Sequence, residues 1–180
     1  PETALAIAMN VDAQFIRVPV LIGTKITENG MIEGKLTEIA TYRQKLRMVN
    51  PPKIFVDVTM NHIVPTPVPQ APWKSPIAYL SELLKAVTRH DVADAIILSD
   101  AEVPADILQE LRKIQEVPLF IGSGITDKTA KEYQEASDGL LLCHGIKKTV
   151  IEGLDPRTSI DMTKVEQIIQ QLKTSELTAV

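Results

Sequence analysis

The sequence has few of the side chains that bind metals or form disulfides: among 180 residues there are one cysteine, Cys143, and three histidines. A single cysteine excludes an intrachain disulfide, which fits a reducing compartment. No two histidines stand at the spacing of a metal site, and Cys143 has no second cysteine to share a metal with. The sequence therefore predicts no resident metal and no cofactor. Cys143 is expected to pack at the end of a buried strand, with a reactive thiol as the alternative.

Long apolar runs and basic stripes are also missing. No apolar stretch approaches the roughly 18 to 20 residues that a membrane-spanning helix needs, so no transmembrane segment is expected, although peripheral membrane association stays open. The formal net charge is −4, and the Lys and Arg residues are spread along the chain, which disfavours a nucleic-acid partner. We expect a soluble, cytoplasmic protein, with the reservation that the sequence begins at Pro1 and shows nothing of any targeting segment upstream.

Apolar residues are abundant, since 44% of the chain is hydrophobic, and this suits one domain over residues 1–180 with a sizeable core. Short β-branched runs alternate with longer stretches of helical periodicity, a pattern that predicts βαβ units and a parallel sheet. The five expected strands are Gln14–Val20, Lys53–Met60, Ala95–Ser99, Pro118–Ile121 and Gly139–Cys143. From this alternation alone, a β/α barrel and an open doubly wound sheet both stay open.

Helices are expected before the first strand and after each of the five strands. The intervening ones are predicted around Leu36–Arg47, Ser75–Arg89 and Pro104–Ile114, each with one apolar stripe. Thr126 is expected to cap the helix between the fourth and fifth strands, and Asp161 the last helix. No internal repeat is visible.

Two charged residues interrupt the first two strands at corresponding places, in the patterns Phe15-x-Arg17 and Phe55-x-Asp57. Because side chains alternate along a strand, Arg17 and Asp57 are expected on the same face of two neighbouring parallel strands, within reach of an ion pair. A structural bridge inside the protein is the simpler interpretation. The alternative is a cation and a carboxylate that face a ligand.

A glycine-rich turn follows the fourth strand, with Gly122, Ser123 and Gly124 leading to Thr126. Glycines let the backbone approach a ligand and expose N–H groups to an anion near a helix start, although a strand-to-helix turn favours glycine anyway. Lys147 follows the last strand, where a phosphate could be reached. These residues are the candidate phosphate site.

Two longer connections, Leu21–Lys35 and Asn61–Lys74, follow strands, where α/β proteins bind ligands. The second connection contains His62 and four prolines, so its alternative is a rigid spacer or a peptide-docking surface. His62 is a candidate general base beside Asp57 and Arg17, or by itself a metal ligand, and a merely solvated histidine is the alternative.

The motifs "FIRV", "GMIEG", "FVDV" and "PLFIGSGIT" occur in this order over most of the chain, and here the sequence resembles the BtpA/SgcQ family of predicted β/α-barrel proteins. The resemblance implies a TIM (β/α)8 barrel of which this chain supplies strands four to eight, with strands one to three missing. Polar residues that the family carries at strand ends are replaced here, by Pro19, Ser99 and Cys143 among others. The resemblance therefore implies an altered active-site mouth.

Two functional hypotheses follow from the resemblance. The first is an enzyme, or a former enzyme, of unknown reaction that binds a phosphorylated small molecule at the carboxyl face of the barrel. The second is a noncatalytic assembly factor, because the family's namesake is associated with photosystem I biogenesis and thylakoid membranes. Unpaired strand edges in a partial barrel would also favour a homo-oligomer.

Overall fold

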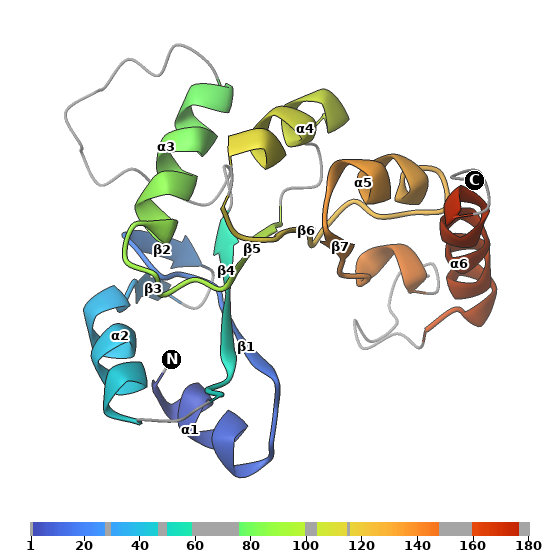
Figure 1. The fold of residues 1–180 in the computed structure, drawn as a ribbon. Helices are drawn as coiled ribbons and strands as arrows, with labels where there is room; N and C mark the ends of the chain where they lie inside the picture. Colours follow the sequence, from blue (N-terminus) through green and yellow to red (C-terminus); the bar gives the residue numbers. More distant parts are fainter. Residues whose placement is uncertain are drawn as a thin grey trace.

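The computed structural model describes residues 2–27, 30–46, 50–58, 76–99, 104–114, 116–147 and 160–176, and its centre is a five-stranded parallel sheet (Figure 1). The strands are β1 (Phe15–Val18), β4 (Lys53–Val58), β5 (Ala95–Leu98), β6 (Leu119–Ile121) and β7 (Gly139–Leu140). They lie side by side in the order β1-β4-β5-β6-β7, and every neighbouring pair is parallel. This confirms the prediction of one parallel sheet ordered as in the chain.

The observed strands are shorter than the predicted ones, most clearly at the last strand. The expected strand Gly139–Cys143 has only two residues in the ladder, Gly139 and Leu140. The backbone N–H of Leu141 still donates to the carbonyl of Ile121 at 2.8 Å, so the chain follows β6 one residue further. It then turns into the 3-10 helix η1 (His144–Ile146), which removes Cys143 from the sheet.

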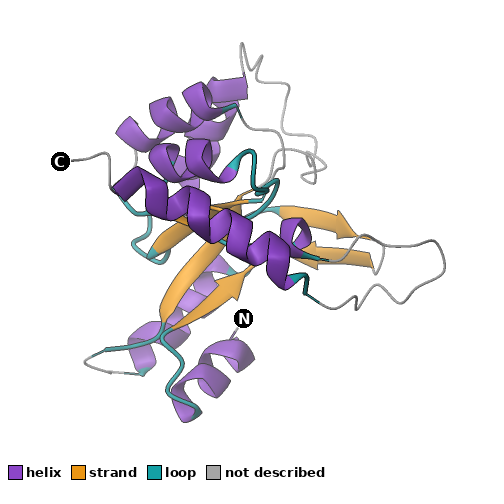
Figure 2. Cartoon of the chain, turned by 90° about the vertical axis from the view of Figure 1, so that its right-hand side faces the viewer, coloured by secondary structure: helices purple, strands orange, loops and turns teal. Residues whose placement is uncertain are grey.

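Helices flank the strands as the periodicity predicts (Figure 2). They are α1 (Glu2–Asn10), α2 (Leu36–Lys45), α3 (Pro76–Thr88), α4 (Ala105–Ile114), α5 (Ala130–Ala136) and α6 (Met162–Glu176). Asp161 caps α6 as expected, since its carboxylate accepts the backbone N–H of Thr163 at 3.0 Å and that of Lys164 at 3.4 Å. The expectation for Thr126 is wrong: α5 begins at Ala130 and its N-cap residue is Thr129.

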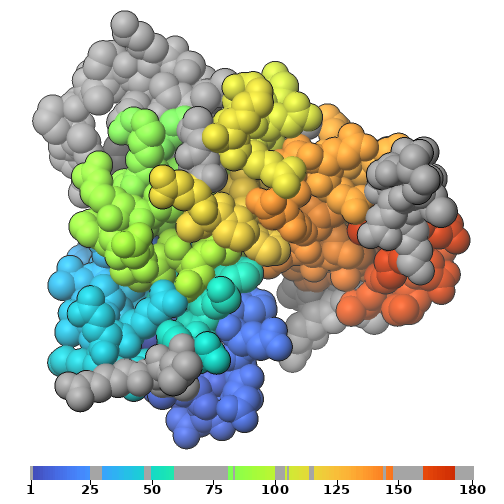
Figure 3. Space-filling model, viewed as in Figure 1, coloured from blue at the N-terminus to red at the C-terminus, as the bar shows by residue number. Residues whose placement is uncertain are grey.

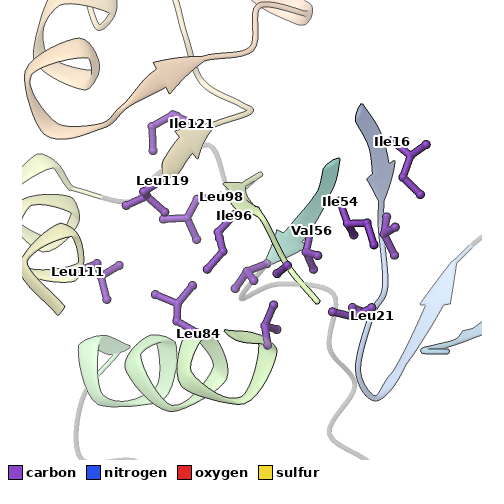
Figure 4. Close-up of a cluster of buried hydrophobic side chains, with 14 of the residues drawn as sticks. Ile16, Leu21, Ile54, Val56, Leu84, Ile96, Leu98, Leu111, Leu119 and Ile121 are labelled. Atoms are coloured by element: carbon purple, nitrogen blue, oxygen red, sulfur yellow. The ribbon is translucent and has the colours of Figure 1, made fainter. Parts of the chain in front are cut away.

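The hydrophobic core lies between one face of the sheet and the helices (Figure 4). Alternate residues of the strands supply it, and all six described helices contribute to the same cluster. Ile54, Val56 and Ile96 are fully buried on the sheet side, opposite Leu84 of α3 and Leu111 of α4. Because every helix packs on this one face, the open doubly wound arrangement, with helices on both faces, does not apply.

A β-hairpin stands where the sequence suggested only a long connection. Strand β2 (Thr24–Thr27) pairs antiparallel with β3 (Gly30–Glu33), with Thr27 opposite Gly30. The dipeptide Asn29-Gly30 between two short β-prone runs is a strong hairpin signal, and Gly30 has a φ of 110° that favours glycine. The hairpin could therefore have been predicted.

The second long connection, with His62 and the four prolines, falls in residues 59–75, outside the described residues. The interpretations of that segment as a functional loop or as a docking surface therefore stay predictions. Among the helices in the described ranges, none combines the length and the apolar composition that crossing a bilayer needs.

Candidate functional site

The sheet face opposite the helices carries a row of aromatic rings. All three phenylalanines of the chain lie there. Phe15 stacks on Phe55 with ring centroids 4.5 Å apart, and Phe55 meets Phe120 at 5.2 Å. Residues with small or no side chains stand beside the rings, because Phe55 is in register with Ala95 and Phe120 with Gly139. A Cβ at Gly139 would collide with the ring of Phe120, so this ring packs directly on the backbone of β7.

A polar network follows this aromatic row at the carboxyl ends of β1, β4 and β5. Arg17 donates from Nε to Asp57 Oδ2 at 2.8 Å and from Nη2 to Asp57 Oδ1 at 2.9 Å. The hydroxyl of Ser99 donates to Asp57 Oδ1 at 2.7 Å and lies 3.2 Å from Arg17 Nη2. The predicted pairing of Arg17 with Asp57 is therefore confirmed, and its geometry is bidentate.

The two partners of the ion pair in this network differ in their exposure to solvent. The Asp57 side chain is 6% exposed, whereas that of Arg17 is 47% exposed. The hydrogen bond to Asp57 raises the pKa of Arg17, partial burial acts against this, and the negative charge of Asp57 raises it further. Arg17 is thus held as a permanent cation by a buried carboxylate while its outer edge faces solvent, an arrangement suited to binding an anion.

Ser99 is the member of this network that sequence reasoning did not assign to a site. It directly follows β5 and was noted only as a departure from the family pattern. The strand register contains the missing signal, because Asp57 is in register with Ile97, and Ser99 stands two residues further on the same side. Its hydroxyl donates to the carboxylate of Asp57 and accepts from the guanidinium of Arg17.

A hollow of about 650 Å³ lies beside Arg17, between the outer edge of β1 and the β2–β3 hairpin. Its walls are largely apolar, with charged groups at Arg17, Lys35 and Glu33. The other residues that line it are Ala4, Val18, Pro19, Val20, Met31 and Ile32. A small ligand could place an anionic group against Arg17 and its apolar or neutral part in this hollow.

The glycine-rich turn after β6 is closed in this structure. Gly122, Ser123 and Gly124 line a cavity of only about 10 Å³ with Cys143 and Gly145 among its other walls, which is no more than one water requires. The N–H of Gly122 donates to the carbonyl of Leu98 at 2.7 Å. Of the three expected amide donors, only Ser123 and Gly124 are then left for an anion, and it would have to lie outside the turn.

Of the two remaining predicted phosphate ligands, Thr126 belongs to this turn and Lys147 does not line its cavity. The N–H of Thr126 donates to Thr129 Oγ1 at 2.9 Å, and that hydroxyl donates to the carbonyl of Gly124 at 2.8 Å, so the threonines close the turn on itself. Lys147 forms an isolated antiparallel bridge with Ile160, and its carbonyl accepts a hydrogen bond from Lys164 Nζ at 2.7 Å. Lys147 does not line the small cavity.

The structure bears on the predictions for Cys143 and His62 in different ways. Cys143 is exposed, so its prediction as a buried packing residue is wrong, because the strand ends before it. His62 lies outside the described residues. Within the described ranges, no group of three or more His, Cys, Asp or Glu residues is placed to hold a metal ion.

Comparison with solved structures identifies the architecture. The structure is similar to N-(5'-phosphoribosyl)anthranilate isomerase from Pyrococcus furiosus, with a TM-score of 0.59 and 13% sequence identity, over 97% of this chain and 70% of that one. It is also similar to a structure described as native KDPGal, with a TM-score of 0.58 and 8% identity, over 98% of this chain and 66% of that one. At such identities the likeness concerns the fold alone, which is a TIM-barrel-like α/β fold.

Comparison of sequences identifies relatives of much greater length. The photosystem I biogenesis protein BtpA of Synechocystis is 30% identical over 162 residues, which cover 86% of this chain and 53% of that protein. An uncharacterized protein of Methanocaldococcus jannaschii is 33% identical over 172 residues, which cover 92% of this chain and 59% of that protein. The chain thus spans somewhat more than half the length of these relatives. The family model described as the BtpA family matches residues 1–174, and the chain belongs to that family.

Proposed function

We propose that this chain binds a phosphorylated small molecule at the carboxyl ends of its strands, as part of an enzyme with a TIM-barrel fold whose reaction is not identified. One observation carries the proposal: a half-exposed arginine, Arg17, is held in place at that end by the buried Asp57. A guanidinium that is fixed by its own carboxylate but open on its outer edge loses little freedom when it binds a phosphate.

The barrel itself belongs to this proposal. In a TIM barrel the inner face of the sheet is filled by layers of side chains, and the ligand site lies at the carboxyl ends of the strands. The row of Phe15, Phe55 and Phe120 corresponds to such an inner layer, and the network of Arg17, Asp57 and Ser99 to the polar mouth beyond it. We propose that this chain supplies the last five βα units of the barrel, as its share of 53% and 59% of the relatives' lengths would allow.

The proposed roles follow from the contacts. Arg17 binds the phosphate, and Asp57 and Ser99 position Arg17, because both carboxylate oxygens of Asp57 are already hydrogen-bonded. Ser123 and Gly124 add backbone N–H groups from the neighbouring turn, with Thr126 shaping that turn. His62 stays the candidate general base. Lys147 would have to turn toward the mouth to contribute.

The test is ligand binding by the protein, measured by calorimetry and thermal shift with a panel of sugar phosphates and the same sugars without phosphate. We expect at least one phosphorylated compound to raise the melting temperature and its unphosphorylated form to have no effect. Arg17→Ala should weaken binding about 10- to 100-fold, the equivalent of a lost hydrogen-bonded charge. Arg112→Ala is the matched control, because Arg112 is 45% exposed and also paired with an aspartate, Asp138. Equal binding of both sugar forms would overturn the proposal.

A second candidate function is that of an assembly factor, the role in the printed name of the Synechocystis relative. Four exposed apolar side chains favour it, because they belong to neighbouring N-terminal elements: Ile7 and Val11 at α1, Phe15 of β1 and Met31 of β3. Such side chains suit association with another protein or with a second copy of this chain. Absence of any phosphate-dependent shift across the panel, together with a stable protein complex that Met31→Lys abolishes, would favour this function.

A further inference from the structure

The amino end of the strand pair β4–β5 is fastened by Asp94, the residue immediately before β5. The N–H of Ile54 donates to Asp94 Oδ2 at 2.8 Å, and the N–H of Asp94 donates to the carbonyl of Ile54 at 2.8 Å. Arg43 of α2 donates to Asp94 Oδ1 at 3.0 Å and to the carbonyl of Val92 at 3.1 Å. One aspartate thus connects the two strands to the helix that precedes them.

The strand pair β6–β7 is fastened in the same way by Asp138, the residue immediately before β7. The N–H of Leu119 donates to Asp138 Oδ2 at 2.9 Å, and the N–H of Asp138 donates to the carbonyl of Leu119 at 2.8 Å. Arg112 of α4 donates to Asp138 Oδ1 at 2.8 Å and to the carbonyl of Glu135 at 3.4 Å. The bonds of the aspartate are the same in both arrangements, whereas the carbonyl that the arginine reaches belongs to Val92, two residues before Asp94, and to Glu135, three residues before Asp138.

The steps between these pairs are built differently. The residue before the second strand is a proline in both of these steps, Pro52 before β4 and Pro118 before β6. Backbone bonds join the strands there, from the N–H of Lys53 to the carbonyl of Gln14 and from the N–H of Ile96 to the carbonyl of Pro118. The arrangement of arginine and aspartate therefore recurs at every second strand of the described sheet. The ladder register repeats with it, because Phe55 stands opposite Ala95 and Phe120 opposite Gly139.

We infer that the sheet contains two copies of one unit, in which the end of a helix is followed by a strand, a helix and a second strand, over residues 43–99 and residues 112–143. Superposing the two aspartates matches Asp94-Ala-Ile-Ile-Leu-Ser99 with Asp138-Gly-Leu-Leu-Leu-Cys143. Superposing the strands that they bond matches Ile54-Phe-Val-Asp57 with Leu119-Phe-Ile-Gly122. The repeat escapes a scan of the sequence because few residues are identical and the connections differ in length.

This equivalence joins the two halves of the candidate site. Asp57 and Ser99 of the first copy correspond to Gly122 and Cys143 of the second copy. The first two are hydrogen-bonded at 2.7 Å, and the other two line one small cavity together. The same two positions of the unit therefore occur twice in the mouth. In the first copy they hold the carboxylate of Asp57 and the hydroxyl of Ser99, and in the second copy they hold Gly122, which has no side chain, and the thiol of Cys143. The inference does not depend on whether a phosphate binds there.

The first test compares the two aspartates by hydrogen exchange of individual backbone amides. Asp94→Ala should lower the protection of the Ile54 amide about 10- to 100-fold and leave the Leu119 amide unchanged, and Asp138→Ala should do the reverse. Arg43→Gln and Arg112→Gln provide milder variants should either alanine variant fail to fold. Glu82→Gln and Glu110→Gln, which break exposed i,i+3 ion pairs on helices, should change neither amide. An effect on one unit alone would overturn the inference.

The second test exchanges equivalent strand residues. Ala95→Gly, Ile96→Leu and Ile97→Leu together give β5 the sequence of its counterpart in the second copy, because Leu98 already equals Leu142. We expect this triple variant to unfold cooperatively, with a urea midpoint close to that of the parent. The matched control, Ala95→Leu, Ile96→Leu and Ile97→Gly, has the same composition in another order and places a leucine opposite Phe55. If the control is as stable as the ordered exchange, the two units are not equivalent.

Discussion

At the scale of single residues, the pair of Arg17 and Asp57 combines a buried partner with a half-exposed one. Loss of a buried ion's partner is costly because the remaining charge is left without compensation. Asp57 has 6% of its side chain exposed and cannot reach water easily, whereas Arg17, at 47%, can turn outward. The two single substitutions should therefore have unequal effects, although both remove the same hydrogen bonds.

We expect Arg17→Ala to lower the free energy of unfolding by roughly 1 to 3 kcal/mol, and by more than Asp57→Ala does. Urea denaturation of both variants measures this. An equal loss of unfolding free energy from the two substitutions would mean that the Arg17 and Asp57 side chains are buried to the same extent, contrary to the structure. A neutral Asp57→Asn would assign the pair to ligand binding rather than to stability.

A second residue-scale feature is Gly145, in the short helical turn after β7. A Cβ added there would collide with the backbone carbonyl oxygen of Ile125, which no side-chain movement can relieve. We expect Gly145→Ala to destabilise the protein by about 1 to 3 kcal/mol or more, measured by thermal unfolding. The control is Gly23→Ala, where a φ of 76° adds strain but no atom lies within 4 Å of the new Cβ, so the cost should be near 1 kcal/mol. Equal melting temperatures would show that η1 is free to move away from the turn after β6.

At the scale of elements, helix termini differ in how well the sequence specifies them. Asp161 accepts two backbone N–H groups of α6, whereas Lys35, at the start of α2, provides no side-chain cap. Thr129, directly before α5, is its N-cap residue instead of Thr126, because the two threonines stand three residues apart in one turn and the helix begins only after the second. Capping signals therefore locate a helix start only to within one turn.

We expect Asp161→Ala to cost about 0.5 to 2 kcal/mol, because α6 would lose its capping acceptor. Asp161→Asn should change stability by only a few tenths of a kcal/mol, since asparagine caps about as well. The measurement is chemical denaturation, with helix content followed by circular dichroism. If alanine and asparagine cost the same, the stabilisation comes from the charge near the helix dipole and not from the cap.

At the scale of the whole molecule, the sheet has two outer edges. In the described sheet, β1 pairs only with β4, and β7 only with β6. Figure 3 shows the N-terminal elements in blue at the bottom of the view and the C-terminal helix in red at its right-hand side. Phe15 is 47% exposed on the edge strand β1. An edge with an exposed ring beside it is a surface for association.

We expect the 180-residue chain to form oligomers or aggregates at micromolar concentration, as measured by size-exclusion chromatography with light scattering. Phe15→Lys should shift the distribution toward monomer, because a charge on an edge strand opposes pairing. Ile169→Lys is the control, since Ile169 is exposed on α6, away from that edge. A monodisperse monomer of the parent chain would show that the edges are covered, and would remove the basis for proposing a homo-oligomer.

Some features of the fold and of the candidate site were predicted correctly from the sequence and others were not, and each outcome has a physical reason. The pairing of Arg17 with Asp57 followed from the alternation of side chains along the strands, which depends on backbone geometry alone. The strand order followed from the family resemblance, because alternation along a strand does not say which strands are neighbours. The exposure of Cys143 was missed, because an apolar sequence run does not show where the ladder hydrogen bonds end. The β2–β3 hairpin was missed although Asn29-Gly30 indicated it.

The sequence by itself determined the local features of this protein: which segments form helices and strands, which side of each strand is apolar, and its membership of the BtpA family. Only the tertiary structure decided which of these segments meet. Ser99 joined Asp57, and Asp94 and Asp138 each bonded a strand far from them in sequence, because register between distant strands arises from packing and not from neighbouring residues. For the same reason the glycine-rich turn, open to an anion by its composition, is closed in the fold by Thr129 and the carbonyl of Leu98.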